Sequence, residues 1–404
     1  MSLGEIRKSN GVRIVHPGKD LDAVMTEVLS AYPDELFCFL NENKLRKNVG
    51  ILSAYFLPTD ERRKILYALK ANPLDRIVQI LNEEGIDGFD CASPQEIDLA
   101  LGLNPKAEIY FNHPIKTRGA IRTALQRGVR YFAAQAKKEI EKILEPATPH
   151  DYPEIAIRLQ TWNEKAKINL STKFGASETD TGEMLKMLKD KAAPRGLCIH
   201  TGSQNESPEA FESGIELMAS IAKSEGGVHS INVGGGIPVN IHPDDPFDIK
   251  NFLTRISQSV RDNLRGVLAE DARSPKIILE PGRAIIAEAV DMAIPVLAVE
   301  KRWGKKCAYI HDGVFTSFSD YPIHHWKWHF QTFSTTGREF SAVKEPYVVF
   351  GRTCDSGDTL GEILLPDDLR EGDFLRVPSA GAYMDSQASN FNGFGPPKYV
   401  SYNS

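Results

Sequence analysis

Residues 196–236 read GLCIHTGSQNESPEAFESGIELMASIAKSEGGVHSINVGGG. Two short apolar runs, 196–201 and 230–234, flank a helix-length segment at 208–224, which is the pattern of two parallel strands joined by a helical crossover. The unit recurs between Lys64 and Arg283, with further strand candidates at 65–70, 88–91, 108–112, 130–134, 154–159 and 276–280. Eight strands within roughly 220 residues favour a (β/α)8 barrel over an open doubly wound sheet.

The pattern changes after Arg283. Strand-like runs at 293–299, 307–310, 347–350 and 374–377 are separated by Gly, Pro and Asp rather than by long helices, and another candidate strand, 36–40, precedes the barrel. We therefore predict an α/β protein in two domains. A barrel spans residues 41–284, and residues 1–40 and 285–404 form a discontinuous all-β domain, sandwich-like or barrel-like, that carries the loop around Cys354.

Composition narrows the function. Among 404 residues, 48 Lys and Arg face 54 Asp and Glu, so the net charge is −6, which provides no broad basic surface for nucleic acid. No apolar run is long enough to predict a membrane span. The cysteines are odd in number and lack a C-x-x-C pair, which indicates neither a disulfide framework nor a zinc site and fits a cytoplasmic protein. We expect a small-molecule substrate and no metal.

Polar residues collect where the barrel strands should end, which is where barrel enzymes place their catalytic groups. Three consecutive glycines, 234–236, allow backbone N–H groups to approach an anion, and Gly282-Arg283 after the next strand adds an amide and a guanidinium. Each feature alone is also typical of a tight turn or a surface arginine. Their occurrence on adjacent strands predicts a phosphate-binding site.

The other strand ends supply Lys70, Asp90, Arg158, His200 and Glu280. A lysine opposite a phosphate site can form a Schiff base with a carbonyl cofactor. Pyridoxal phosphate needs such a lysine, a carboxylate for its ring nitrogen and a partner for its ring face, for which Glu280 and His200 are the candidates. Taken singly, these residues could equally be a solvated lysine, a salt-bridge acid and a core histidine.

Eight ordered motifs between about residues 36 and 394 resemble the fold-type III pyridoxal-phosphate decarboxylases, which include the ornithine, lysine and diaminopimelate decarboxylases. The motifs favour the ornithine decarboxylase branch, in which Lys-Phe-Gly-Ala and Phe-Asn-Gly-Phe are characteristic. They are YALKAN (67–72), FDCAS (89–93), LSTKFGA (170–176), HTGSQ (200–204), GGGIP (234–238), EPGR (280–283), CDSGD (354–358), and GAY (381–383) with FNGF (391–394).

The resemblance implies a role for each matching residue. Lys70 would hold the cofactor as an internal aldimine, His200 would stack on its ring, and Glu280 would pair with the pyridine nitrogen. Asp90 and Arg158 would shape the surrounding network, and the phosphate would be bound by Ser203, Gly235, Gly236, Gly282, Arg283 and Tyr383. Cys354 and Asp355 would complete the site of the partner subunit in an obligate homodimer, with Cys354 protonating the carbanion left by carbon dioxide.

The segment that resembles the substrate-binding part of these enzymes departs from their pattern. Ornithine decarboxylases usually present Tyr-Asp-His, whose Asp binds the distal ammonium, where this sequence has Ile323-His324-His325. Asp320 or His324 could compensate, and Asp355 still offers one carboxylate. Gln204 and Ser-Gly-Asp after Cys354 suggest diaminopimelate decarboxylases instead. Those enzymes usually place an arginine in this segment, and none lies between Arg302 and Arg338.

A third possibility is a siderophore-type decarboxylase of a diamino acid conjugated to a carboxylate such as citrate. The run from His324 to His329 would suit a larger anionic tail, although a half-exposed strand is its simpler interpretation. No Cys or carboxylate joins these histidines at the usual spacing of metal ligands.

Our leading hypothesis is pyridoxal-phosphate-dependent decarboxylation of an ornithine- or lysine-type diamino acid. An alanine-type racemase would place an arginine, not Glu280, on the pyridine nitrogen. A catalytically inactive regulatory homologue is the alternative from another class. It would be expected to lose some of Lys70, His200, Glu280, Arg283 and Cys354, all of which are present.

Overall fold

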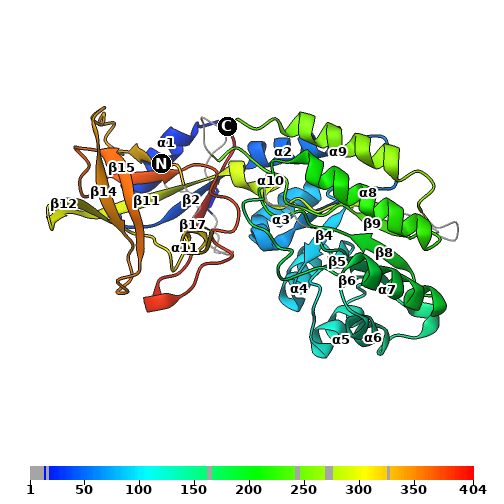
Figure 1. The fold of residues 1–404 in the computed structure, drawn as a ribbon. Coiled ribbons are helices and arrows are strands. Elements are labelled where there is room, and N and C mark those ends of the chain that lie inside the picture. Colours follow the sequence, from blue (N-terminus) through cyan, green and yellow to red (C-terminus); the bar gives the residue numbers. More distant parts are fainter. Residues whose placement is uncertain (1–12, 15–17, 162–165, 242–245, 269–275, 325–327) are drawn as a thin grey trace. The chain divides into compact units, whose positions relative to one another are not determined.

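A computed structural model describes residues 13–14, 18–161, 166–241, 246–268, 276–324 and 328–404. The chain forms two compact units. The barrel unit comprises residues 48–239 and 247–285, and the β unit comprises residues 1–47, 240–246 and 286–404 (Figure 1). Each is described in turn.

The barrel unit contains a closed ring of parallel strands, which confirms the predicted (β/α)8 barrel. The ring closes because β10 pairs with β3, with Ile277 opposite Arg63 and Leu279 opposite Ile65. In order, the strands are β3 (Arg63–Ala68), β4 (Gly88–Cys91), β5 (Glu108–Phe111), β6 (Tyr131–Ala134), β7 (Glu154–Arg158), β8 (Arg195–Cys198), β9 (Ser230–Asn232) and β10 (Lys276–Leu279).

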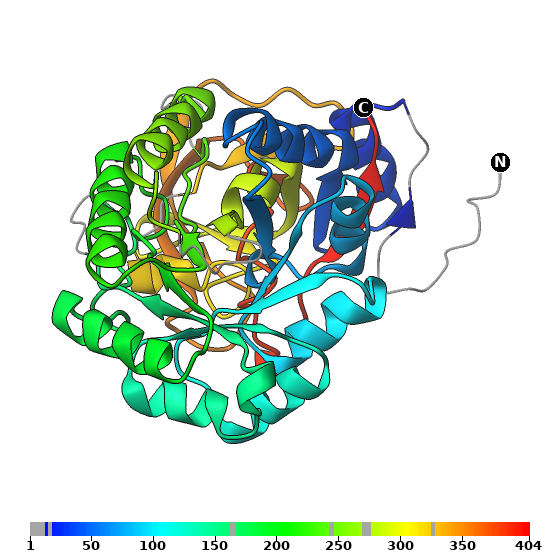
Figure 2. The ribbon, with the colours of Figure 1, turned by 90° about the vertical axis from the view of Figure 1, so that its right-hand side faces the viewer.

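Helices surround this ring (Figure 2). Their inner faces carry apolar residues at helical spacing, as in α8, which buries Phe211, Ile215, Met218 and Ala222. The helices of the barrel are α2 (Glu42–Tyr55), α3 (Asp75–Glu83), α4 (Pro94–Leu103), α5 (Arg118–Gln126), α6 (Lys137–Leu144), α7 (Glu178–Asp190), α8 (Pro208–Ser224), α9 (Ile249–Asn263) and the short α10 (Arg283–Ile286).

The barrel interior is packed with side chains. Leu66, Tyr110 and Ile278 form one buried cluster with Tyr131 against it, although they come from strands that are not all neighbours, so they meet across the inside of the ring. The rings of Tyr110 and Tyr131 stack with centroids 4.3 Å apart. This apolar layer forms a floor beneath the polar residues at the C-terminal ends of the strands.

The β unit contains a mixed sheet. Its strand β2 (Phe37–Asn41) pairs in parallel with β17 (Lys398–Tyr402) and antiparallel with β11 (Val290–Arg302), so both ends of the chain contribute to one sheet. The other strands are β1 (Arg13–Ile14), β12 (Lys305–Ile310), β13 (Gln331–Phe333), β14 (Lys344–Phe350), β15 (Thr359–Pro366) and β16 (Phe374–Val377).

The predicted second domain built on a β-sheet is confirmed, and in addition to its strands it contains a helix that the sequence analysis did not predict. Helix α1 (Leu21–Ala31) packs Val24, Met25, Val28 and Leu29 into a core cluster that includes Phe37 of the sheet. The i, i+1, i+4, i+5 spacing of those residues is a helical signal. Among the described residues, no helix is both long and apolar enough to cross a membrane.

Candidate active site

The strand predicted for residues 65–70 ends earlier than expected, so Lys70 lies outside it. Strand β3 stops at Ala68, whose N–H donates to the carbonyl of Pro281, and Lys70 lies in the following 3-10 turn, η1 (Leu69–Ala71). The Nζ of Lys70 lies 2.7 Å from Oδ2 of Asp90. The lysine side chain is 42% exposed whereas that of Asp90 is 2% exposed, so a buried carboxylate holds an accessible amine.

A second carboxyl group lies beside this pair. Glu96, in the first turn of α4, accepts the backbone N–H of Ala92 at 2.5 Å. Burial, followed by the nearby charge of Asp90, raises the pKa of Glu96. Sequence reasoning missed Glu96, although Ser93-x-x-Glu96 is the pattern of a capping box and Ser93 does cap α4.

Glu280, immediately after β10, is the residue that the sequence analysis expected to pair with the pyridine nitrogen. Its Oε1 accepts hydrogen bonds from Nδ2 of Asn112 and from Nδ2 of Asn232. Burial raises the pKa of Glu280, and Asp90 adds to this rise, while Lys70 and the Asn232 hydrogen bond oppose it. Neither asparagine was predicted from the sequence, although Asn232 ends β9 and Asn112 directly follows β5, which are positions where polar groups were expected.

His200 follows β8 by two residues and is electrically neutral. Its Nδ1 accepts the N–H of Gly202 at 3.2 Å, so the ring proton belongs on Nε2. Burial, then the charges of Arg158 and Lys70, hold the pKa of His200 well below its usual range. The guanidinium of Arg158 lies 5.2 Å from the ring centroid of Phe174, a contact that orients this cation.

The glycine turn after β9 is required by packing as well as by any ligand. A Cβ on Gly235 would lie 2.3 Å from the carbonyl oxygen of Glu280, and one on Gly236, where φ is +95°, would lie 1.9 Å from that of Gly202. Within the described part of the chain, the N–H groups of Gly235 and Gly236 donate to no acceptor. Unused donors of this kind fit a phosphate group.

The remaining predicted phosphate ligands of the barrel unit lie in the neighbouring loops. Arg283 begins α10 and is buried, and Gly282 precedes it. The N–H of Ser203 is occupied by the carbonyl of Ile168 at 3.0 Å, which leaves its hydroxyl as the group able to face an anion. The barrel residues therefore fit the predicted cofactor: an accessible amine, a buried carboxylate, a neutral imidazole and amides suited to phosphate.

The Cys354 loop belongs to the β unit. Cys354 and Asp355 are exposed, while the buried carboxylate of Asp358 accepts the N–H and hydroxyl of Thr353 and the N–H of Val314 at 2.8 Å. The backbone N–H of Cys354 donates to Oδ1 of Asn392 at 3.0 Å. Hydrogen bonds to Asp358 and Asn392 therefore fix the backbone of the loop, while the Cys354 thiol and the Asp355 carboxylate are exposed to solvent.

Residues 51–287 match the family model described as "Pyridoxal-dependent decarboxylase, pyridoxal binding domain". The chain belongs to the pyridoxal-dependent decarboxylases. Pyridoxal phosphate is its cofactor, and the enzyme is an amino-acid decarboxylase, as the sequence motifs predicted. The predicted kinship with ornithine decarboxylase-like enzymes is likewise confirmed by the relatives.

Two curated relatives and one solved structure illustrate the likeness. The decarboxylase is 28% identical over 340 residues to the lysine/ornithine decarboxylase of Selenomonas ruminantium, covering 82% of each chain. It is 30% identical over 351 residues to the ornithine decarboxylase of Schizosaccharomyces pombe, covering 83% of this chain and 76% of the relative. The Vibrio vulnificus lysine/ornithine decarboxylase complexed with putrescine superposes with a TM-score of 0.80 at 26% identity, covering 95% and 99% of the two chains.

The half-exposed strand offered as the simpler interpretation of residues 324–329 is not found in the described part of that run, because His324 ends a short helix and residues 328 and 329 have no regular secondary structure. Asp320 and His324 are the first and last residues of α11 (Asp320–His324), with Asp320 buried and His324 half-buried. Residues 325–327 lie outside the described residues. Among the described residues, no group of three or more His, Cys, Asp or Glu could hold a metal ion.

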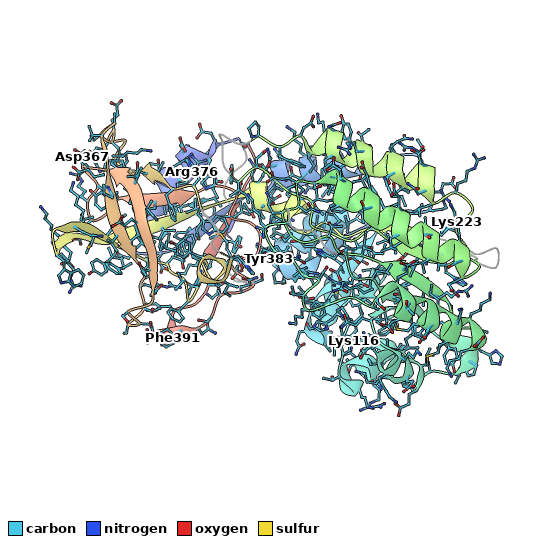
Figure 3. All side chains as sticks on the ribbon, in the orientation of Figure 1. Lys116, Lys223, Asp367, Arg376, Tyr383 and Phe391 are labelled. Carbon is cyan, nitrogen blue, oxygen red and sulfur yellow. The ribbon has the colours of Figure 1, made fainter. Side chains whose placement is uncertain are left out.

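One predicted and one unpredicted residue of interest lie in the β unit. Tyr383 was expected to bind phosphate and is labelled in Figure 3; its backbone is left-handed, with φ of +68°. Arg352, two residues before Cys354, was not predicted from the sequence. Its Nη2 donates to the carbonyl of Gly395 at 2.7 Å, and its guanidinium lies 4.7 Å from the ring centroid of Phe394.

Proposed function

We propose that this decarboxylase acts on a diamino acid of the ornithine or lysine type, with Lys70 as the amine that binds the cofactor covalently. The observation that carries this is the strand-end cluster, in which the accessible Lys70 amine shares one barrel mouth with Asp90, Glu280 and His200. Bound pyridoxal phosphate would supply an electron sink for the electron pair that stays on the substrate carbon when carbon dioxide leaves.

The residues of the barrel have complementary roles in this proposal. Glu280 holds the pyridine nitrogen in its protonated form through its carboxylate, because an anion there favours the N–H cation. His200, neutral because of its burial, covers the ring face without adding positive charge. Asp90 keeps the Lys70 amine in place, and Arg158 balances the local negative charge.

The phosphate is bound in the proposal by amides and one guanidinium. The unused N–H groups of Gly235 and Gly236, with Gly282, Ser203 and Arg283, supply the donors from the barrel unit. Tyr383 adds its hydroxyl. Donors of this kind bind a dianion without a mobile side chain having to be ordered first, since the backbone is already held in the turn.

We further propose a homodimer in which Cys354 and Asp355 complete the partner's site. The support is their exposure on a loop whose buried side, fixed by Asp358 and Asn392, is already satisfied within the chain. In that role Cys354 donates the proton that replaces the lost carboxylate on the substrate carbon.

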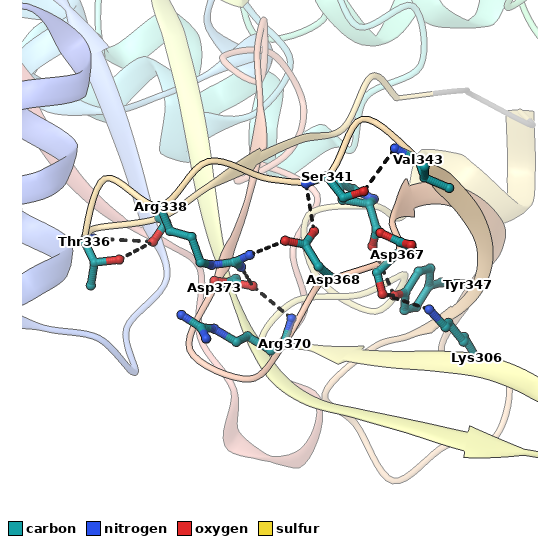
Figure 4. A network of polar contacts seen from close by, with 12 residues as sticks. Lys306, Thr336, Arg338, Ser341, Val343, Tyr347, Asp367, Asp368, Arg370 and Asp373 are labelled. Carbon is teal, nitrogen blue, oxygen red and sulfur yellow. Dashed lines mark hydrogen bonds and ion pairs between the residues drawn. The ribbon is translucent and has the colours of Figure 1, made fainter.

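For the distal end of the substrate, we propose that Asp355 binds an ammonium group, with Asp320 and His324 as additional polar groups. The two arginines that bracket this segment are engaged elsewhere: Arg338 binds Asp368 and Asp373 (Figure 4), and Arg302 lies against the ring of Trp303. The engagement of both arginines favours a substrate of the ornithine or lysine type over diaminopimelate, which carries a distal carboxylate.

Arg352 is the cation nearest in sequence to Cys354, and it bears on the citryl-conjugate alternative. Its charge faces two buried carboxylates, Asp312 and Asp358, which compensate it within the β unit. A guanidinium that faces two carboxylates attracts a substrate carboxylate weakly, because the surroundings of Arg352 are already net negative before the carboxylate binds. A diamino acid therefore remains the first proposal.

The test is a carbon dioxide release assay on ornithine, lysine, arginine, diaminopimelate, diaminobutyrate and a citryl-diamino acid. We expect ornithine or lysine to be turned over fastest and Lys70→Ala to abolish release. Turnover confined to diaminopimelate or the citryl conjugate would overturn the substrate assignment. Asp355→Ala should weaken the binding of ornithine or lysine more than the binding of a substrate with an anionic tail.

The shared site is tested by mixing two inactive variants, Lys70→Ala and Cys354→Ala. Random exchange places half of the chains in mixed dimers, and each mixed dimer keeps one complete site, so activity should return to about a quarter of the wild-type value. No recovery after complete subunit exchange would show that each chain completes its own site.

A further inference from the structure

Three hydrogen bonds form a closed ring between Glu280 and the glycine turn. The Nδ2 of Asn232 donates to Oε1 of Glu280 at 2.5 Å, the N–H of Gly234 donates to Oδ1 of Asn232 at 2.8 Å, and the N–H of Glu280 donates to the carbonyl of Gly234 at 2.9 Å. Because Oδ1 accepts a backbone N–H, the amide can present only its NH2 group to the carboxylate.

Asn112 donates to the same carboxylate oxygen from another strand end. Its backbone N–H bonds the carbonyl of Cys91 at 3.1 Å, which ties it to β4. Two amides therefore converge on Oε1 of Glu280. The other oxygen, Oε2, accepts no hydrogen bond from the described residues.

Two neutral amide donors meet two competing electrostatic requirements on the Glu280 carboxylate. A half-buried, desolvated carboxylate facing Asp90 tends to take up a proton, and a protonated Glu280 could not stabilise a pyridinium. A cation bound to Glu280 would keep it ionised but would compete with the ring nitrogen for it. Neutral amides stabilise the ionised form without cancelling its charge.

We propose that Asn112 and Asn232 are positioning residues that fix the Glu280 carboxylate through Oε1 and leave Oε2 for the pyridine nitrogen. Through Gly234, Asn232 also couples this end of the cofactor to the glycine turn at its phosphate end. The inference rests on the proposed role of Glu280 as the partner of the ring nitrogen.

The experiment is a double-mutant cycle read by cofactor binding rather than by turnover. Apoprotein is titrated with pyridoxal phosphate, and the dissociation constant is taken from the visible absorption band. Asn112→Leu, which removes a donor whose only described side-chain partner is Glu280, should raise this constant about tenfold, because a hydrogen bond to a charged group is lost. In the Glu280→Gln background the same change should have less than about a threefold effect.

A pH profile separates this role from a structural one. Without one amide donor Glu280 takes up a proton more readily, so cofactor binding should weaken with falling pH about one unit earlier in Asn112→Leu than in wild type. Asn232→Leu should shift the profile in the same direction and, because it also releases Gly234, should keep part of its effect in the Glu280→Gln background. This second variant keeps the test informative if Asn112→Leu does not fold.

Asn82→Leu is the matched control, since Asn82 accepts an amide hydrogen bond from Asn104 in the helical layer at 2.9 Å and does not contact Glu280. It should leave both the dissociation constant and the pH profile unchanged. Equal effects of Asn112→Leu in the two backgrounds, or an unshifted profile, would overturn the positioning role. Failure of the proposed function would instead appear as absent carbon dioxide release by a protein that binds the cofactor normally.

Discussion

Gly235→Ala perturbs the barrel where both the packing of the strand ends and the proposed binding of the cofactor phosphate require a residue without a side chain. The new Cβ would lie 2.3 Å from the carbonyl oxygen of Glu280, a separation that real Cβ contacts do not show, and the atom it meets belongs to the backbone. The backbone φ at this position is not left-handed, so the cost is steric rather than conformational. Strands β9 and β10 must move apart at their ends.

The expected magnitude follows from the clash. Forcing one methyl group into a packed site typically costs about 1–3 kcal/mol. Displacing the unused N–H of Gly235 would also remove its proposed hydrogen bond to the cofactor phosphate, which should raise the dissociation constant of the cofactor about tenfold or more. The two losses should appear together because one displacement causes both.

The assay compares Gly235→Ala with Gly50→Ala by urea unfolding of the apoproteins and by titration with pyridoxal phosphate. Gly50 lies inside α2, is exposed, and has open space where its Cβ would be, so the same substitution there should stabilise by about 1 kcal/mol and leave cofactor binding unchanged. A Gly235→Ala protein with wild-type stability and cofactor affinity would refute the packing argument.

Three further predictions concern charge. Burial raises the pKa of Glu280 in the folded apoprotein above the ordinary value of 4.5, near which the unfolded chain releases its proton. The contribution of Glu280 to the free energy of unfolding therefore falls as the pH rises above 4.5. Glu280→Gln should flatten this pH dependence when unfolding is measured across a pH series. Arg338→Ala should lower the urea stability of the β unit by about 3 kcal/mol, since Asp373 stays buried, and a loss below about 1 kcal/mol would contradict this. Glu139→Gln should cost about 3 kcal/mol because it removes the carboxylate that balances the charge of the buried Lys116 ammonium and leaves that ammonium bonded to the carbonyls of His113 and Ala133; wild-type thermal stability would be the contrary result.

Much of the fold could be predicted because its signals are local. Each barrel strand is a short apolar run followed by a helical segment, and eight repeats of that unit leave few topologies other than a closed ring. The strand expected at 65–70 was wrong at its C-terminal end, because Lys70 lies in a 3-10 turn that follows the strand. Helix α1 was not predicted, although Val24, Met25, Val28 and Leu29 have helical spacing.

By itself, the sequence determined the residue types at the strand ends and their order, and therefore the family and its cofactor. Only the tertiary structure brought Asn112 and Asn232 onto one oxygen of Glu280, because they are 120 residues apart in a chain that aligns their strand ends in space. It also decided which charges are buried, and burial is what makes His200 neutral and raises the proton affinity of Glu280. A pKa depends on the surrounding atoms, which no local pattern specifies.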